Sequence, residues 1–166
     1  LGRDGCRVPL PWSGVERPFG FSPAGAAASK PTWLPQPANW ASLTVEAQNE
    51  DEHSMLHLYK SMLQLRRSNM VLGGGDLGWV LTPEQSAKTQ LLHIRLSLPL
   101  PTEAPTTRPR VADVADVAPV TEVEMLVNFG DAPVVLPEQE VLLASAPLRG
   151  GYLPANASVI LAVASG

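Results

Sequence analysis

The densest group of residues that could do chemistry lies at the start of the chain, where residues 2–12 read GRDGCRVPLPW. Arg3, Asp4 and Arg7 lie in one loop, which glycines allow to turn and prolines restrict. A guanidinium offers a rigid fork of donors that suits carboxylates and the paired hydroxyls of a sugar. Composition alone favours a plainer interpretation, an exposed Arg3–Asp4 ion pair of almost no energetic value.

Two other groups could bind a metal or react. His53 and His57 are four residues apart, a spacing that can chelate zinc on a helix, but no glutamate stands between them to complete an HExxH motif. Two ligands without a third rarely make a site, so we expect no metal. The single cysteine, Cys6, has no identifiable base beside it and is expected to be a small packed thiol. We expect no cofactor.

Composition excludes several functional classes. Twelve Lys and Arg residues against sixteen Asp and Glu leave a net charge of −4, which argues against a nucleic-acid partner. No apolar run approaches the ~20 residues of a membrane helix, so no membrane partner is expected. One cysteine and the absence of a signal-peptide pattern at the start favour the cytoplasm. Because the chain begins with leucine, we expect it to be the tail of a longer protein.

The elements that must position the Arg-rich loop are a long irregular segment and one helix. Residues 1–50 are rich in Pro, Gly and Trp and show no sustained apolar period, so they predict an ordered loop. Residues 51–68 have apolar residues at helical spacing. Asn49 or Asp51 is the predicted cap, and Arg66 and Arg67 suit the negative end of the helix dipole.

The second half of the chain predicts β-structure. Apolar and polar residues alternate over 92–98 and 123–129, and shorter runs follow at 133–136, 140–144 and 158–163. Short strands separated by turn residues are typical of an all-β antiparallel sandwich. Residues 99–119 contain five prolines and the imperfect repeat VADVADVA, which predicts a flexible Pro-rich insertion.

The order of these motifs resembles the bacterial α-glucosidases of the α-amylase superfamily (glycoside hydrolase family 13), oligo-1,6-glucosidases among them. The similarity rests first on GRDGCRVPLPW, then on Phe19-Gly20-Phe21-Ser22, Trp33-Leu34-Pro35 and Val45-Glu46-Ala47-Gln48. The helix that ends Leu65-Arg66-Arg67-Ser68 resembles the last barrel helix of that family. Weaker motifs near Leu126-Val127-Asn128-Phe129 and Val141-Leu142-Leu143 resemble its C-terminal sandwich.

The resemblance implies the end of a (β/α)8 barrel (loop plus last helix) followed by an all-β antiparallel sandwich. Residues 1–70 would be the C-terminal end of the catalytic barrel and 71–166 the sandwich domain. The implied activity is that of a retaining α-glucosidase hydrolysing short α-linked glucosides in carbohydrate metabolism. Its catalytic carboxylates would lie upstream, so this piece alone is expected to be inactive and to pack against the missing N-terminal barrel.

The resemblance also implies roles for the loop residues. Arg7 matches the arginine that holds the terminal glucose of an oligosaccharide or disaccharide substrate, whereas Arg3 and Asp4 would brace the loop. Two alternatives stay open: a non-catalytic carbohydrate-binding or scaffold β-sandwich, and a transglycosylating relative of the trehalose or isomaltulose synthase type. Linkage preference, oligomeric state, calcium dependence and any role of residues 99–119 are left undetermined by the sequence.

Overall fold

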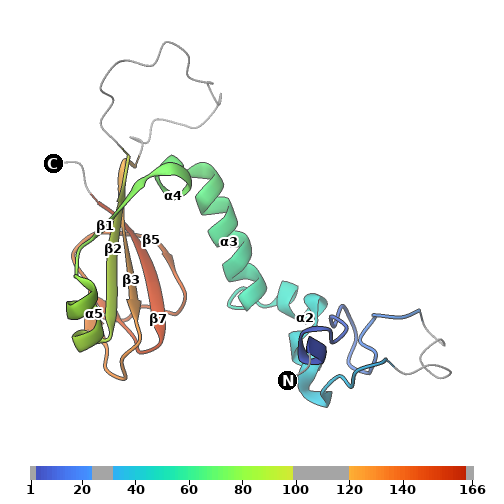
Figure 1. Cartoon of the computed structure of the whole chain (residues 1–166). Helices are drawn as coiled ribbons and strands as arrows, with labels where there is room; N and C mark the ends of the chain where they lie inside the picture. The colour runs from blue at the N-terminus through green and yellow to red at the C-terminus, as the bar shows by residue number, and fades with distance from the viewer. Residues whose placement is uncertain (1–2, 24–31, 99–119, 164–166) are drawn as a thin grey trace, which may run out of the picture. The chain divides into compact units, whose positions relative to one another are not determined.

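The computed structural model describes residues 3–23, 32–98 and 120–163 (Figure 1). The predicted insertion at 99–119 therefore lies outside the described residues. The chain divides into two compact units, Leu1–Lys60 and Ser61–Gly166. The first contains irregular chain and short helices, and the second is built mainly from β-strands. Among the helices that these residues form, none is long and apolar enough to cross a membrane.

The first unit contains three short helical elements. They are the 3-10 helices η1 (Arg3–Cys6) and η2 (Ala38–Leu43) and the α-helix α2 (Val45–Glu50). The buried Thr44 begins α2, because its hydroxyl oxygen accepts a hydrogen bond from the Ala47 N–H at 3.1 Å. The sequence predicted loop throughout residues 1–50, and α2 was missed because six residues are too few to show a helical period.

Helix α3 spans Met55–Ser68, so the helix predicted over 51–68 is confirmed except for its first turn. Neither Asn49 nor Asp51 caps it, since Asn49 belongs to α2 and Asp51 ends α2 in an extended conformation. The Asp51 carboxylate instead accepts the His53 N–H at 2.9 Å. Ser54 is the residue before the helix, and its hydroxyl oxygen accepts the His57 N–H at 3.2 Å.

A second short helix, α4 (Met70–Gly74), leads into the sheet. The Asn69 side chain caps its start by accepting the Val71 N–H at 3.1 Å, and Val71 is buried. Of the three consecutive glycines Gly73, Gly74 and Gly75, only Gly75 lies beyond the helix. A Cβ on Gly75 would lie 2.7 Å from the Val71 carbonyl oxygen and 2.9 Å from Val71 Cγ2, whereas Gly73 and Gly74 face open space.

Gly75→Ala is therefore expected to lower the free energy of unfolding of this chain by about 1–3 kcal/mol, since the added methyl group collides with Val71 in the first turn of α4. Gly73→Ala is the matched control. It should raise stability by up to about 1 kcal/mol, because alanine favours the helix more than glycine does. Urea denaturation of both variants checks the pair. Equal changes in unfolding free energy for Gly75→Ala and Gly73→Ala would contradict the close approach of Gly75 to Val71.

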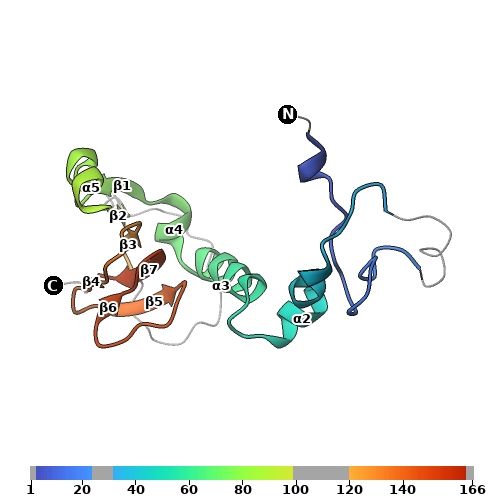
Figure 2. The same ribbon diagram turned by 90° about the horizontal axis from the view of Figure 1, so that it is seen from below.

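All strand pairs in the second unit are antiparallel. The larger sheet has the order β1-β2-β3-β7-β5, and β4 pairs with β6 in a separate sheet. The small sheet lies beside β7 (Figure 2). The strands are β1 (Asp76–Trp79), β2 (Leu91–Ser97), β3 (Glu122–Asn128), β4 (Val134–Val135), β5 (Glu140–Ala144), β6 (Tyr152–Leu153) and β7 (Ala157–Ala162). The antiparallel β-sandwich predicted after the barrel end is confirmed, while β1, β6 and the helix α5 (Pro83–Thr89) were not predicted.

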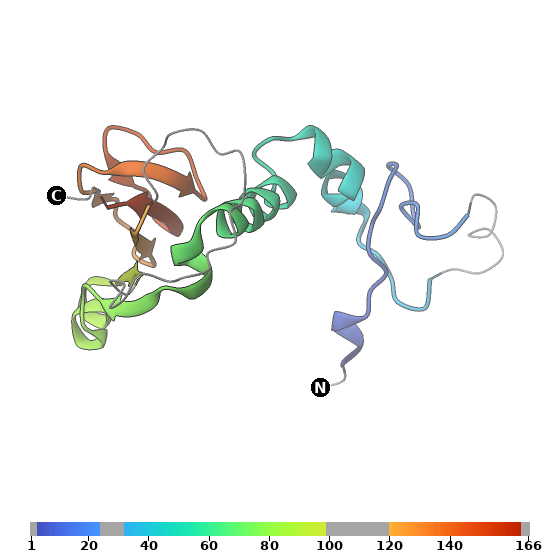
Figure 3. The ribbon, with the colours of Figure 1, turned by 90° about the horizontal axis from the view of Figure 1, so that it is seen from above.

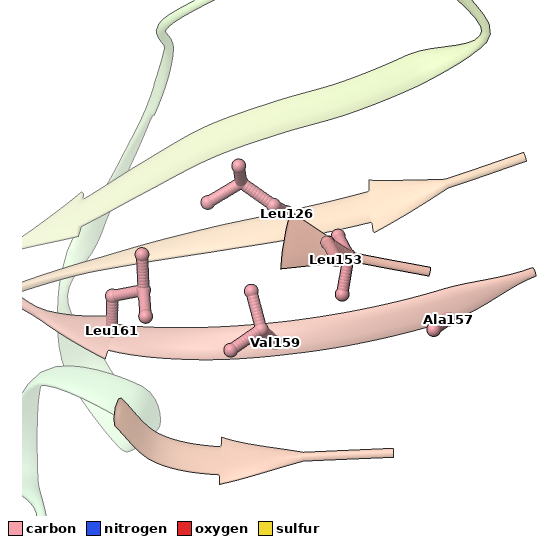
Figure 4. Close-up of a cluster of buried hydrophobic side chains, with 5 residues drawn as sticks. All are labelled: Leu126, Leu153, Ala157, Val159 and Leu161. Atoms are coloured by element: carbon pink, nitrogen blue, oxygen red, sulfur yellow. The ribbon is translucent and has the colours of Figure 1, made fainter. Parts of the chain in front are cut away.

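The large sheet is apolar on both faces, which explains how it joins the small sheet and the helices. On one face, buried side chains from β3, β6 and β7 gather into a single cluster (Figure 4). Its members are Leu126, Leu153, Ala157, Val159 and Leu161. On the other face, Val123 and Ile160 pack with Val71 of α4 and with Leu65 of α3. Each face therefore buries apolar area that stabilises the unit.

Candidate functional site

The three residues singled out in the sequence lie at or beside one helical turn. Arg3 and Asp4 belong to η1, and Arg7 follows that turn directly. The side chains of Arg3, Cys6 and Arg7 are exposed, so Cys6 is not the packed thiol that the sequence predicted. An arginine stays protonated and has no acceptor, so Arg7 can bind and orient a ligand but cannot act as a general base.

The segment after Arg7 is held by the start of α2 and by the chain before η2. The Pro9 carbonyl oxygen accepts a hydrogen bond from Gln36 Nε2 at 3.0 Å. The carbonyl oxygens of Pro11 and Trp12 accept from the Val45 and Glu46 N–H groups at 3.1 and 3.0 Å. Figure 3 shows this blue N-terminal segment beside the cyan helices η2 and α2.

A tight loop follows at residues 12–20. The N–H groups of Trp12 and Ser13 both donate to the Phe19 carbonyl oxygen, at 2.7 and 3.0 Å, and Phe19 is buried. The Gly14 N–H donates to Glu46 Oε2 at 2.8 Å. Gly20 has a φ of +70° and no room for a Cβ, which would collide with the Ser13 hydroxyl. The loop is thus held by hydrogen bonds between its own two ends and by a hydrogen bond to the Glu46 side chain.

Gln36 and Glu46 are the anchoring residues that sequence reasoning did not single out. Gln36 is 1% exposed, and its contact joins residues 27 positions apart. The only local signal is a polar residue enclosed by Pro35 and Pro37. Glu46 belongs to a motif already noted, but its contact with Gly14 spans 32 positions.

The aromatic residues of the first unit differ in exposure. Trp33 is 91% exposed, Trp12 and Phe21 are about half exposed, and Trp40 is half-buried. An exposed ring can stack on a sugar or pack against another surface. The sequence favoured packing for most of the tryptophans, and this stays a prediction.

Among the described residues, the hydrogen bonds of His53 and His57 are local. A ring nitrogen of His57 lies 3.1 Å from the Asn49 carbonyl oxygen, and the His53 N–H donates to Asp51. Within residues 3–23, 32–98 and 120–163, no group of three or more His, Cys, Asp or Glu residues is placed to hold a metal ion.

A second polar cluster lies on the β2–β3 pair. Glu124, whose side chain is 5% exposed, accepts hydrogen bonds from His93 Nε2 at 3.0 Å and from Arg95. Arg95 also pairs with Glu122 at 3.1 Å. Burial raises the pKa of Glu124, but the hydrogen bonds and charges of Arg95 and His93 outweigh it and hold this pKa below its ordinary value. The cluster is a satisfied ion network that joins two strands.

Glu124→Gln should therefore lower the free energy of unfolding at pH 7 by about 1–3 kcal/mol, since Arg95 and His93 lose their buried anionic partner. A lowered folded-state pKa contributes stability that is present above the unfolded pKa of about 4.3 and is lost as pH falls through the folded value. The difference in unfolding free energy between the unaltered chain and Glu124→Gln should narrow below about pH 4. Urea titrations from pH 3 to 8 test this, with the more exposed Glu122→Gln as the control, and a gap independent of pH would contradict it.

Two family models match separate parts of the chain. Residues 1–75 match the α-amylase catalytic domain, and residues 108–160 match a domain of unknown function, DUF3459. The chain is 35% identical over 81 residues to a probable alpha-glucosidase of Rhizobium meliloti (strain 1021), covering 49% of this chain and 13% of that protein. It is 34% identical over 80 residues to the oligo-1,6-glucosidase of Parageobacillus thermoglucosidasius, covering 48% and 13%.

Solved structures show the same fold over nearly the whole chain. Isomaltulose synthase from Klebsiella sp. LX3 matches with a TM-score of 0.68 and 20% identity, covering 97% of this chain and 26% of that one. Trehalose-6-phosphate hydrolase from Bacillus licheniformis matches with a TM-score of 0.63 and 18% identity, covering 96% and 26%. The chain spans about 13% of the length of the curated relatives it matches. Both family models and the curated relatives agree, and they confirm the resemblance to the α-amylase superfamily, glycoside hydrolase family 13.

Proposed function

We propose that this chain is the C-terminal part of a retaining α-glucosidase that hydrolyses short α-linked glucosides. The observation that carries the proposal is the exposed Arg7 on an anchored loop, within a segment that matches the α-amylase catalytic domain. The names of the sequence relatives, probable alpha-glucosidase and oligo-1,6-glucosidase, support glucosides as the substrate class. We include a cytoplasmic location and a role in carbohydrate metabolism in this proposal.

The reaction assigns binding to this chain and bond cleavage to the rest of the protein. In a retaining glycosidase a carboxylate attacks the anomeric carbon while a carboxylic acid protonates the departing oxygen, and the resulting carboxylate then takes a proton from the attacking water. Arg7 would hold hydroxyl groups of the terminal glucose through its fork of N–H donors. Arg3 and Asp4 would brace the loop. This piece alone would then be inactive.

Residues 1–70 would complete a barrel, and 71–166 would form the domain that follows it. The exposed apolar side chains of α3 support packing of this helix against the missing part of the barrel. Met55 is 60% exposed, Tyr59 64% and Leu63 48%, which is unusual for one helix of a folded protein. On this proposal the chain alone binds a hydrophobic dye strongly, and the intact protein does not.

The decisive experiment assays the intact protein and this chain side by side on maltose, isomaltose and sucrose. The intact protein should release glucose with its α-configuration retained, and the chain alone should release none. Glycan binding by the chain together with an inactive intact protein would replace the proposal by a carbohydrate-binding or scaffold role. Formation of a new disaccharide instead of glucose would favour a transglycosylating enzyme, in line with the name of the structurally similar isomaltulose synthase.

A further inference from the structure

The side chain of Gln36 makes the contact nearest to Arg7 that links the Arg-rich loop to a distant part of the chain. Its Nε2 donates to the Pro9 carbonyl oxygen at 3.0 Å, two residues beyond Arg7. Two further hydrogen bonds, from the backbone N–H groups of Val45 and Glu46, reach Pro11 and Trp12. A side-chain substitution can therefore remove the Pro9 contact without altering the other two.

The chain between Arg7 and Trp12 is stiff, so a contact at Pro9 constrains its neighbours. Pro9 and Pro11 fix their own φ angles, and each restricts the residue before it to extended conformations. Few rotatable bonds are left between the Pro9 carbonyl and the Arg7 Cα. Holding this carbonyl in place therefore restricts where the Arg7 backbone can lie.

Stability alone does not account for an amide at position 36. Gln36 is 1% exposed, and its Oε1 is buried without a hydrogen-bond partner among the described residues. An unpaired buried acceptor costs free energy, which an apolar side chain of similar volume would avoid. The Nε2 donor is the part of this side chain that has a partner, and that partner lies in the loop carrying Arg7.

We propose that Gln36 is a positioning residue, which orients Arg7 toward the terminal sugar by holding the Pro9 carbonyl. The inference rests on the proposed function, since it gives Arg7 its substrate. Gln36 touches no substrate and acts only through the Arg7 loop. Its loss should therefore weaken recognition of short α-glucosides and leave the rest of the protein folded.

A double-mutant cycle in the intact protein tests this role. Gln36→Met keeps the side-chain volume and removes the donor, and it should lower kcat/KM for maltose about tenfold, since small misplacements of binding groups reduce rates steeply. In an Arg7→Ala background the same change should cost less than about twofold, because the group that it positions is gone. A purely structural role predicts equal factors in both backgrounds.

Gln48→Met is the matched control. Gln48 also lies in the first unit and donates its Nε2 to a backbone carbonyl, that of Leu43 at 2.9 Å. Its Oε1 accepts the Leu56 N–H at 3.2 Å, so it joins α2 to α3 and does not contact the Arg7 segment. This variant should show the same kcat/KM as the unaltered protein, whatever its effect on the unfolding midpoint.

The outcomes separate this inference from the proposed function. A protein that loses activity with Arg7→Ala but not with Gln36→Met would overturn the positioning role and keep the glucosidase proposal. If the intact protein has no activity on α-glucosides, hydrogen exchange of residues 8–14 decides. Faster exchange there in Gln36→Met, but not in Gln48→Met, supports the role of Gln36 in holding the Pro9 carbonyl. Unchanged exchange in Gln36→Met overturns it.

Discussion

Replacing Arg7 by alanine in the intact protein should lower kcat/KM for maltose or isomaltose by about 100-fold. The side chain is exposed at the end of an anchored loop and is free of burial costs that would hide its effect on binding. A 100-fold loss corresponds to about 2.8 kcal/mol, which one strong hydrogen bond to a charged group, or two weak ones of about 1.5 kcal/mol each, would supply. Steady-state kinetics on both disaccharides measures the loss.

Two further substitutions show whether the loss belongs to Arg7 itself. Arg7→Lys keeps the charge but replaces the planar fork by a single ammonium group, so it should recover only part of the activity. Arg17→Ala removes another exposed arginine of the first unit, outside the RDGCR motif, and should leave the kinetics unchanged. Unaltered turnover in Arg7→Ala would refute the binding role.

The sequence predicted the site less completely than the fold, and the reason is physical. The arginines stand in a loop whose composition alone favours a surface ion pair, and only the order of motifs along the chain pointed to sugar binding. Gln36 and Glu46 escaped notice because their contacts join residues 27 and 32 positions apart. Contacts of that separation leave no periodic signal in one sequence.

In the second unit, the longer strands that place apolar side chains in a packed layer were predicted well. The alternation over 92–98 and 123–129 corresponds to β2 and β3, whose apolar residues enter the two clusters. β1 and β6 are too short to alternate visibly. Helix α5 has no buried residue and therefore no apolar stripe. Its Thr82–Gln85 capping box with Pro83 at the first position was nevertheless readable.

Helix α3 was predicted correctly as a helix, but its first residue was misplaced. Asn49, Asp51 and Ser54 are all good capping residues, and the sequence does not rank them. The structure uses Ser54, whose hydroxyl also donates to the Gln48 carbonyl oxygen at 2.6 Å. That second contact depends on α2 ending at Glu50. Local helix propensity does not predict where α2 ends, so the sequence did not single out Ser54.

Asn128→Leu should be among the most destabilising single changes in the second unit, lowering its free energy of unfolding by about 3–4 kcal/mol. Asn128 is 1% exposed at the end of β3. Its Nδ2 donates to the carbonyl oxygens of Ala132, Pro154 and Leu153, at 2.9, 3.0 and 3.4 Å, and its Oδ1 accepts the Gly130 N–H at 3.0 Å. Leucine matches the volume but leaves these backbone groups without a partner.

The expected size of this effect follows from what the amide joins. Asn128 links the turn after β3 to the residues around the end of β6, so its loss weakens the contact between the two sheets as well as the turn. Asn128→Asp should not rescue stability, because it keeps the acceptor but replaces the donor by a buried charge. Asn39→Leu, at an exposed position in η2, should change stability by less than about 0.5 kcal/mol. Urea denaturation followed by far-ultraviolet circular dichroism compares the three, and a shift for Asn128→Leu no larger than that of Asn39→Leu would show that water replaces the amide at this turn.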